Sequence, residues 1–184
     1  MPVYSYDGVL PRISPSAYVH PDAVVIGDVT MGPESSAWPG TVLRGDHGRI
    51  VVGARTSVQD GTVVHTTPEH PTVVEADCVV GHNAHLEGCV VRTRSLVGSM
   101  ATVLNRVVIG ERSVVGAGAV VPEGLQVPPD SMVLGVPARV RPRTTTDHDE
   151  WLEYAVGVYV GNARKYPTLL RAVRLEDCRT DETD

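Results

Sequence analysis

Residues 108–121 have the sequence VIGERSVVGAGAVV, in which Ile109, Val115 and Val121 are spaced six residues apart. A glycine directly follows the first two of these aliphatic residues. A step of six matches neither the 3.6-residue period of an α-helix nor the two-residue alternation of a β-strand. It predicts a triangular coil in which each side is one short strand, aliphatic residues point inward, and small residues turn the corners.

The same step recurs through most of the preceding sequence. Further members of the repeat are Ile13, Val19, Val25, Met31, Ala37, Leu43, Val52, Val58, Val64, Val91, Val97 and Val103. The alternative, Val-rich strands in a β-sandwich, gives no reason for a fixed step of six. The repeat breaks twice: a loop is inserted between Val64 and Val74, and a step of five leads from Val80 to His85. We therefore expect His85 at a position where the coil normally holds an aliphatic residue.

The repeat stops near Pro142, and the pattern then changes to that of a helix. We predict a β-helix domain over residues 1–143, and a C-terminal helix and tail packed on the coil over residues 144–184. The helix is expected from residue 147 to about residue 163. Its predicted apolar face consists of Trp151, Ala155, Val158 and Asn162.

The composition excludes several classes of function. The chain has a net charge of −6 and a pI of about 5.6, so it lacks the basic excess that nucleic-acid binding needs. The sequence has neither a signal-peptide pattern nor an apolar run of membrane-spanning length. We therefore expect a cytoplasmic protein that acts on a small molecule, with no nucleic-acid or membrane partner.

Three histidines, His65, His82 and His85, fall close together in the predicted coil. His65 follows one core position and His82 follows another about one turn later, so both are expected near one corner. Imidazoles on a rigid ladder are good ligands for transition metals. A trimer would complete such a site with ligands from two subunits. Surface histidines at tolerant turn positions are the alternative, but the polar neighbours favour metal binding; these are Gln59, Asp60 and Glu87.

A series of motifs resembles the γ-class carbonic anhydrase-like family. The motifs occur in the family's order and are LRGD (43–46), QDGTVVH (59–65), VGHNAHLEGC (80–89), LGVPARVRP (134–142) and YVGNARKY (159–166). A hexapeptide repeat alone is shared with many acyltransferases, whereas this combination is more specific. The resemblance implies an all-β solenoid, a left-handed parallel β-helix of hexapeptide repeats with a C-terminal α-helix.

The resemblance also implies a function and an assembly. Members of the family are homotrimers in which three histidines bind Zn²⁺, or Fe²⁺ or Co²⁺, at each subunit interface, and a bound water hydrates CO₂ as a carbonate dehydratase, a lyase. By motif match, His65 is the first ligand and His82 the second, while Arg44 and Asp46 brace the trimer interface. The remaining matches are polar groups beside the metal water, Gln59 and Asp60, and a tyrosine near the site, Tyr159.

The chain departs from the family at the third ligand. Glu87 occupies the position of the third histidine, His85 stands two places earlier, and Ser57 replaces a common asparagine. Either Glu87 completes a His₂Glu set, which zinc accepts in hydrolases, or His85 takes its place. We expect Glu87 to be the ligand, with His65 from the same subunit and His82 from its neighbour. A carboxylate ligand leaves less positive charge on the metal, so CO₂ hydration should be weak.

Two other functions remain open from the sequence. The same scaffold hosts acyl transfer and thioester hydrolysis in biosynthetic pathways, and fold alone does not choose between chemistries. A trimer that has lost its metal and serves as a structural scaffold is the third possibility.

Overall fold

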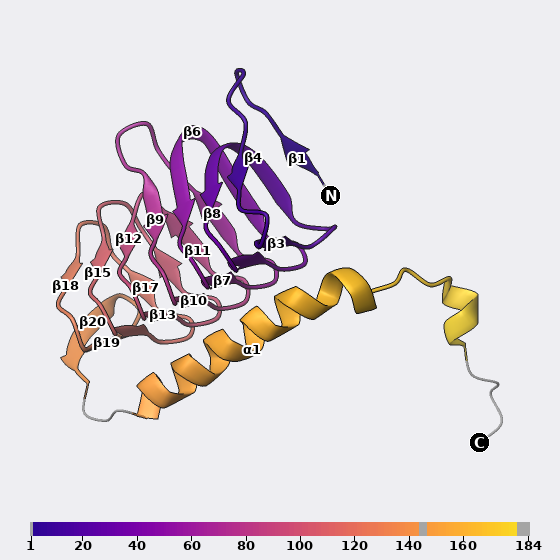
Figure 1. Ribbon diagram of the computed structural model, residues 1–184. Helices are drawn as coiled ribbons and strands as arrows, with labels where there is room; N and C mark the ends of the chain where they lie inside the picture. Colours follow the sequence, from indigo (N-terminus) through magenta and orange to yellow (C-terminus); the bar gives the residue numbers. More distant parts are fainter. Residues whose placement is uncertain (1, 144–146, 180–184) are drawn as a thin grey trace.

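The computed structural model describes residues 2–143 and 147–179 and forms a parallel β-helix with one long helix laid along it (Figure 1). The strands of successive turns are hydrogen-bonded side by side. Val97 pairs with Val115, and Val103 with Val121, so one regular turn takes eighteen residues. This confirms the parallel β-solenoid and C-terminal helix that the step of six predicts.

The strands belong to two sheets. The 12-stranded sheet contains β1 (Val3–Tyr4), β2 (Arg12–Ile13), β4 (Val24–Met31), β6 (Val42–Val52), β8 (Val63–His65), β9 (Thr72–Val74), β11 (His85–Glu87), β12 (Val90–Val91), β14 (Thr102–Val103), β15 (Val108–Ile109), β17 (Val120–Val121) and β18 (Gln126–Val127). The 8-stranded sheet contains β3 (Tyr18–Val19), β5 (Ser36–Ala37), β7 (Ser57–Val58), β10 (Val79–Val80), β13 (Leu96–Val97), β16 (Val114–Val115), β19 (Ser131–Gly135) and β20 (Ala138–Pro142). All pairs between named strands are parallel except β19–β20, which ends the 8-stranded sheet at the C-terminal side.

The interior of the coil is filled by the aliphatic residues of the repeat. Val97, Val103, Ile109, Val115 and Val121 have no exposed surface, as predicted. Each such side chain contributes roughly 1.5–3 kcal/mol by leaving water. The core is therefore a continuous column that runs through the stacked turns.

The register around the histidines differs from the prediction. Leu86, not His85, is the inward residue: it is fully buried and pairs with Val64 and Val103. The step from Val80 to Leu86 is six, and the step of five lies between Leu86 and Val91 instead. The physical reason is that an imidazole would be desolvated in this aliphatic column without a partner, whereas one residue further on a leucine fits it.

The corners of the coil use left-handed backbone conformations. One corner carries Arg55, Asp77, Arg94 and Arg112 with φ between 53° and 59°. The amide of each donates to a carbonyl of the turn before, as in Asp77 N to Ala54 O at 2.9 Å. These bonds offset the steric cost of a positive φ at a non-glycine residue.

Helix α1 (Asp147–Leu169) lies along the coil beside β5, β7 and β10 (Figure 1). Its buried residues are Leu152, Ala155, Val156, Val160 and Ala163. The predicted face is wrong except at Ala155, because Trp151 is 49% exposed and Val158 is 37% exposed. The spacing of four from Leu152 through Val156 to Val160 sets the true contact stripe, which Ala155 and Ala163 widen, and Trp151 and Val158 lie outside it.

The described part of the tail follows α1 and includes a short 3₁₀ helix, η1 (Leu175–Cys178). Residues 170–179 are exposed and extend away from the coil in Figure 1. Over the described residues, the structure contains no helix that is both long and apolar enough to cross a membrane.

Candidate metal centre

The closest approach between predicted ligands is that of His65 and Glu87. His65 ends β8 and Glu87 ends β11, and the two residues are register partners on adjacent turns. His65 Nδ1 lies 3.1 Å from Glu87 Oε1. Because both β-strands are held by the core on either side, the two side chains are placed by the ladder and need no loop to bring them together.

The other ring nitrogen of His65 faces Asp46 on β6. His65 Nε2 lies 3.1 Å from Asp46 Oδ1, while Asp46 Oδ2 accepts a hydrogen bond from Arg44 Nη1 at 2.5 Å. The side chains of His65 and Asp46 are only 12% and 15% exposed. Arg44 and Asp46 therefore pair within one chain, and His65 is held between two carboxylates.

The two carboxylates are acidic in spite of their surroundings. Burial raises the pKa of Asp46, but hydrogen bonds from Arg44 and His65 outweigh this effect and the pKa falls below its ordinary value. Burial likewise raises the pKa of Glu87, but hydrogen bonds from His65 and His85 have the larger effect, so this pKa also falls below its ordinary value. Both groups are therefore anionic near neutral pH, which is the form that binds a cation.

His85 is the second imidazole beside Glu87. Its Nε2 lies 3.3 Å from Glu87 Oε2, and its side chain is 38% exposed. Glu87 thus lies between His65 on one oxygen and His85 on the other. His85 is close enough to orient the carboxylate and remains an alternative ligand.

His82 lies elsewhere, on a corner of the coil. Its Nδ1 lies 2.8 Å from Asp60 Oδ2, and both side chains are 48% exposed. The expectation that His65 and His82 share a corner is wrong, because His82 is stacked above Asp60 and His65 is stacked below Glu87. Among the described residues of one chain, His65, His82 and Glu87 do not bring their donor atoms together as a group.

The remaining predicted site residues lie on the His82 side. Gln59 is buried at 4% exposure beside Asp60, where β7 ends. Tyr159 on α1 packs against Trp38, with ring centroids 5.7 Å apart. Burial, with a further contribution from the charge of Asp60, raises the pKa of Tyr159. Ser57 accepts a hydrogen bond from Trp38 Nε1 at 2.9 Å, which gives this position a role in fixing the tryptophan.

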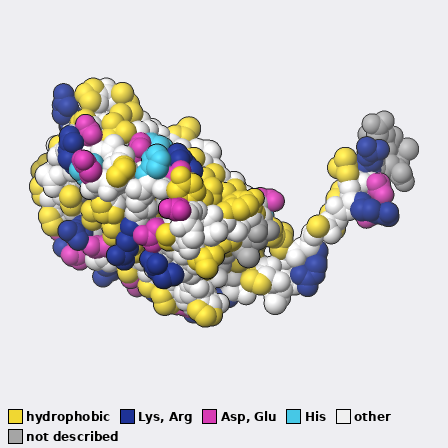
Figure 2. Space-filling model, turned by 90° about the horizontal axis from the view of Figure 1, so that it is seen from above, with side chains coloured by type: hydrophobic (Ala, Val, Ile, Leu, Met, Phe, Trp, Pro, Cys, Tyr) yellow, Lys and Arg dark blue, Asp and Glu magenta, His cyan; other side chains and the backbone are white. Residues whose placement is uncertain are grey.

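One histidine was not found by sequence reasoning. Asp46, His47 and His65 each offer a donor atom, and these atoms all lie within 4.8 Å of one another. His47 is exposed, and its ring centroid is 5.6 Å from that of His65. Figure 2 shows histidine side chains at the surface beside acidic and basic side chains. The sequence did hold a signal for this residue, because His47 directly follows Asp46 of the LRGD motif and the two side chains are both common metal ligands.

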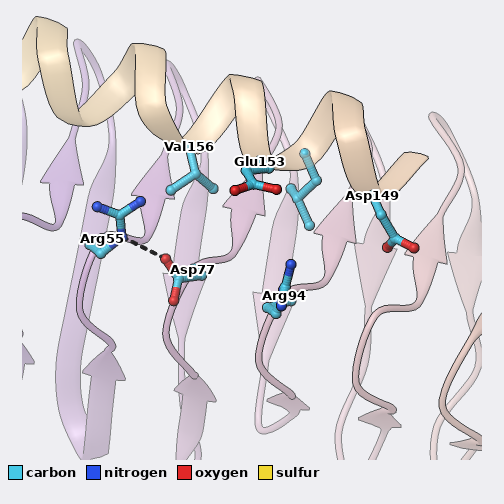
Figure 3. A pocket seen from close by; sticks show the side chains of 7 residues that line it. Arg55, Asp77, Arg94, Asp149, Glu153 and Val156 are labelled. Carbon is cyan, nitrogen blue, oxygen red and sulfur yellow. Dashed lines mark hydrogen bonds and ion pairs between the residues drawn. The ribbon is translucent and has the colours of Figure 1, made fainter. Parts of the chain in front are cut away.

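A separate hollow of about 200 Å³ lies between α1 and one corner of the coil (Figure 3). Arg55, Asp77 and Arg94 line it from the coil, and Asp149 and Glu153 line it from the helix. Arg55 Nε donates to Asp77 Oδ1 at 2.7 Å. None of the predicted site residues lines this hollow, and its mixed charges fit a solvated contact between helix and coil.

The donor chemistry of the cluster fits a transition metal. Zinc binds imidazole nitrogen at about 2.0–2.1 Å and carboxylate oxygen at about 2.0–2.2 Å. His65 supplies an imidazole nitrogen and Glu87 supplies an anionic carboxylate oxygen, and the two residues lie side by side on a rigid ladder. A third donor is needed to hold an ion firmly, and the candidates are a residue of another chain, a residue on the Asp46 side, and His85.

Comparison with known proteins places the chain among two groups of bacterial relatives. It is 37% identical over 167 residues to a carbonic anhydrase of Geobacillus kaustophilus, covering 91% of this chain and 92% of that protein. It is 39% identical over 152 residues to the carnitine operon protein CaiE of a Proteus species, covering 82% and 77%. No protein-family model matches the chain.

The fold of the chain is also similar to that of solved hexapeptide-repeat structures. A hexapeptide transferase family protein from Anaplasma phagocytophilum superposes with a TM-score of 0.86 and 34% identity, covering 90% of this chain and 98% of that one. The similarity therefore extends over the coil and the helix together. The chain belongs to the γ-carbonic anhydrase-like family of hexapeptide-repeat proteins.

Proposed function

We propose that the protein is a metal-dependent enzyme that hydrates CO₂ reversibly, at sites shared between the chains of a homotrimer. The observation that carries the proposal is the pairing of His65 with Glu87 at 3.1 Å, with His82 exposed on a different corner. Because His82 does not reach His65 and Glu87 of its own chain, it is available to the same two residues of a neighbouring chain. The similarity to a carbonic anhydrase over most of the chain supports the same reaction.

The residues of the chain have distinct tasks in this proposal. His65 and Glu87 of one subunit and His82 of the next would hold Zn²⁺, with Fe²⁺ or Co²⁺ as alternatives. When bound, the ion lowers the pKa of a coordinated water so that it is a nucleophile near neutral pH. Asp60 would orient His82 through the contact at 2.8 Å. Gln59 and Tyr159 lie on the same side and would line the substrate's approach.

Because the third ligand is the carboxylate of Glu87, we expect CO₂ hydration to be slow. Glu87 brings a negative charge where a histidine would bring none, so the coordinated water is less acidic and less of it is ionised at neutral pH. Stopped-flow CO₂ hydration with the zinc-loaded protein tests the proposal. Activity above the buffer rate that disappears in His65→Ala is expected, and zinc-loaded wild type without activity would refute it.

A second candidate, acyl transfer or thioester hydrolysis, is favoured by the pair of His82 and Asp60. Asp60 contacts Nδ1 of His82 and leaves Nε2 free, which is the arrangement of a general base. The similarity to a hexapeptide transferase family protein supports it. Thioester cleavage by metal-free protein that is lost in His82→Gln would favour this function. A protein inactive in both assays and free of metal would be a structural trimer.

A further inference from the structure

His65 presents both ring nitrogens to carboxylates, and a neutral ring cannot donate to both. A neutral imidazole has one N–H and one lone pair, so it donates to one carboxylate only. Nδ1 is 3.1 Å from Glu87 Oε1, and Nε2 is 3.1 Å from Asp46 Oδ1. With either tautomer, one nitrogen lone pair faces an anionic oxygen. Both carboxylates are satisfied only when the second nitrogen carries a proton as well, as in an imidazolium, or binds a metal ion.

The third donor lies on the Asp46 side of the ring. Of the described residues, only His47 joins Asp46 and His65 in a group whose donor atoms all lie within 4.8 Å. Two donors bound to one zinc ion at about 2.0–2.1 Å in tetrahedral geometry are roughly 3.3 Å apart. The Nε2–Oδ1 distance of 3.1 Å is thus close to that of two ligands of the same ion.

The Glu87 side supplies the usual support for such a ligand. A metal-binding histidine generally donates its other ring N–H to a carboxylate, which fixes the tautomer and the ring orientation. Glu87 Oε1 is in place to accept that hydrogen bond from Nδ1. Arg44 occupies Oδ2 of Asp46 and leaves Oδ1 for the ion, although its charge weakens cation binding.

We infer that Asp46, His47 and His65 form a divalent-metal site of the zinc class within a single protomer, with Glu87 orienting His65. This set differs from the one proposed for the enzyme, which lies on the opposite side of the imidazole and needs His82 of a neighbour. An ion on Nε2 keeps the proton on Nδ1, so a protomer holds its ion in one set or the other. The inference concerns metal binding and does not depend on which reaction the protein catalyses.

The test removes the neighbour's ligand first. Metal-free His82→Ala protein is titrated with Zn²⁺ by calorimetry and with Co²⁺ by absorption, with metal content measured after gel filtration. We expect about one ion per chain to bind. Adding His47→Ala should weaken binding by about tenfold or more, because loss of a supporting group alone costs 10–100-fold and a ligand costs no less.

Two further variants sharpen the result. Asp46→Asn in the same background should weaken binding similarly while keeping a side chain that can accept from Arg44. His70→Ala is the matched control, since it removes a partly buried histidine outside the group. Circular dichroism and light scattering establish that each variant keeps its fold and assembly.

Two outcomes would overturn the inference. One is a His82→Ala protein that binds no more metal than His65→Ala. The other is a His47→Ala substitution that leaves the affinity of the His82→Ala background unchanged. The proposed reaction fails by a different measurement, namely absent CO₂ hydration by metal-loaded wild type, so each idea can be refuted without the other.

Discussion

Replacing Leu86 by alanine tests the register of the strand that carries the site. Leu86 is fully buried between Val64 and Val103, its partners on the adjoining turns. The change removes three carbons, which is about 2.4 kcal/mol at roughly 0.8 kcal/mol for each buried methylene. The cavity left in a closely packed column adds to this, so we expect a total loss of about 2–5 kcal/mol.

His85→Ala is the control, because it changes the neighbouring residue whose side chain points to the surface. It removes a contact at 3.3 Å with Glu87 from a side chain that is 38% exposed. We expect the free energy of unfolding to change by less than about 1 kcal/mol. Both variants are compared with wild type by urea denaturation at one chain concentration, since assembly makes stability depend on concentration. A larger loss for His85→Ala than for Leu86→Ala would refute the register.

Three further predictions concern the site and its assembly. Light scattering should report three times the 19.7 kDa chain mass, and a monomer at micromolar concentration would remove the basis for a shared site. Glu87→Ala should reduce metal content and Glu87→His should raise CO₂ hydration, whereas His85→Ala should leave metal content nearly unchanged. If His85→Ala empties the site and Glu87→Ala does not, His85 is the ligand. Because the pKa values of Asp46 and Glu87 are lowered by folding, their contribution to stability is complete above their unfolded values of 3.8 and 4.5 and is lost as the pH falls through the lower folded values. Acid unfolding followed by circular dichroism should be shallower in Asp46→Asn with Glu87→Gln, and an unchanged profile would contradict this assignment.

The repeat was readable from the sequence because the coil imposes one constraint at a fixed interval. Each inward position admits only an aliphatic side chain, so Val97 through Val121 mark the register directly. Around the histidines this signal fails, since two consecutive residues, His85 and Leu86, both come near the expected position. Only the burial of Leu86 between its neighbours settles which residue points inward.

The rest of the site depends on contacts across turns of unequal length. Val64 and Leu86 are paired at a separation of twenty-two residues, and Leu43 and Val64 at twenty-one. A turn of eighteen residues would place His82 above His65, whereas the longer turns of the structure place Glu87 above His65. His47 was missed for the same reason: it directly follows the LRGD motif, and its approach to His65 follows from β6 being longer than one side of the triangle.

The antiparallel strand β20 affects whether a second coil can stack on the C-terminal end of the first. Stacked strands leave open hydrogen-bonding groups at each end, on which another coil could continue the ladder as in a fibril. Here the chain doubles back at Ala138–Pro142, and the new outer strand is short, carries Arg139 and Arg141, and ends in proline. Such an edge discourages further pairing on the 8-stranded sheet, whereas the 12-stranded sheet ends at this side in β17 and β18. This asymmetry agrees with the proposed trimer, whose contacts would use the sides of the coil that carry His65 and His82 and not its ends.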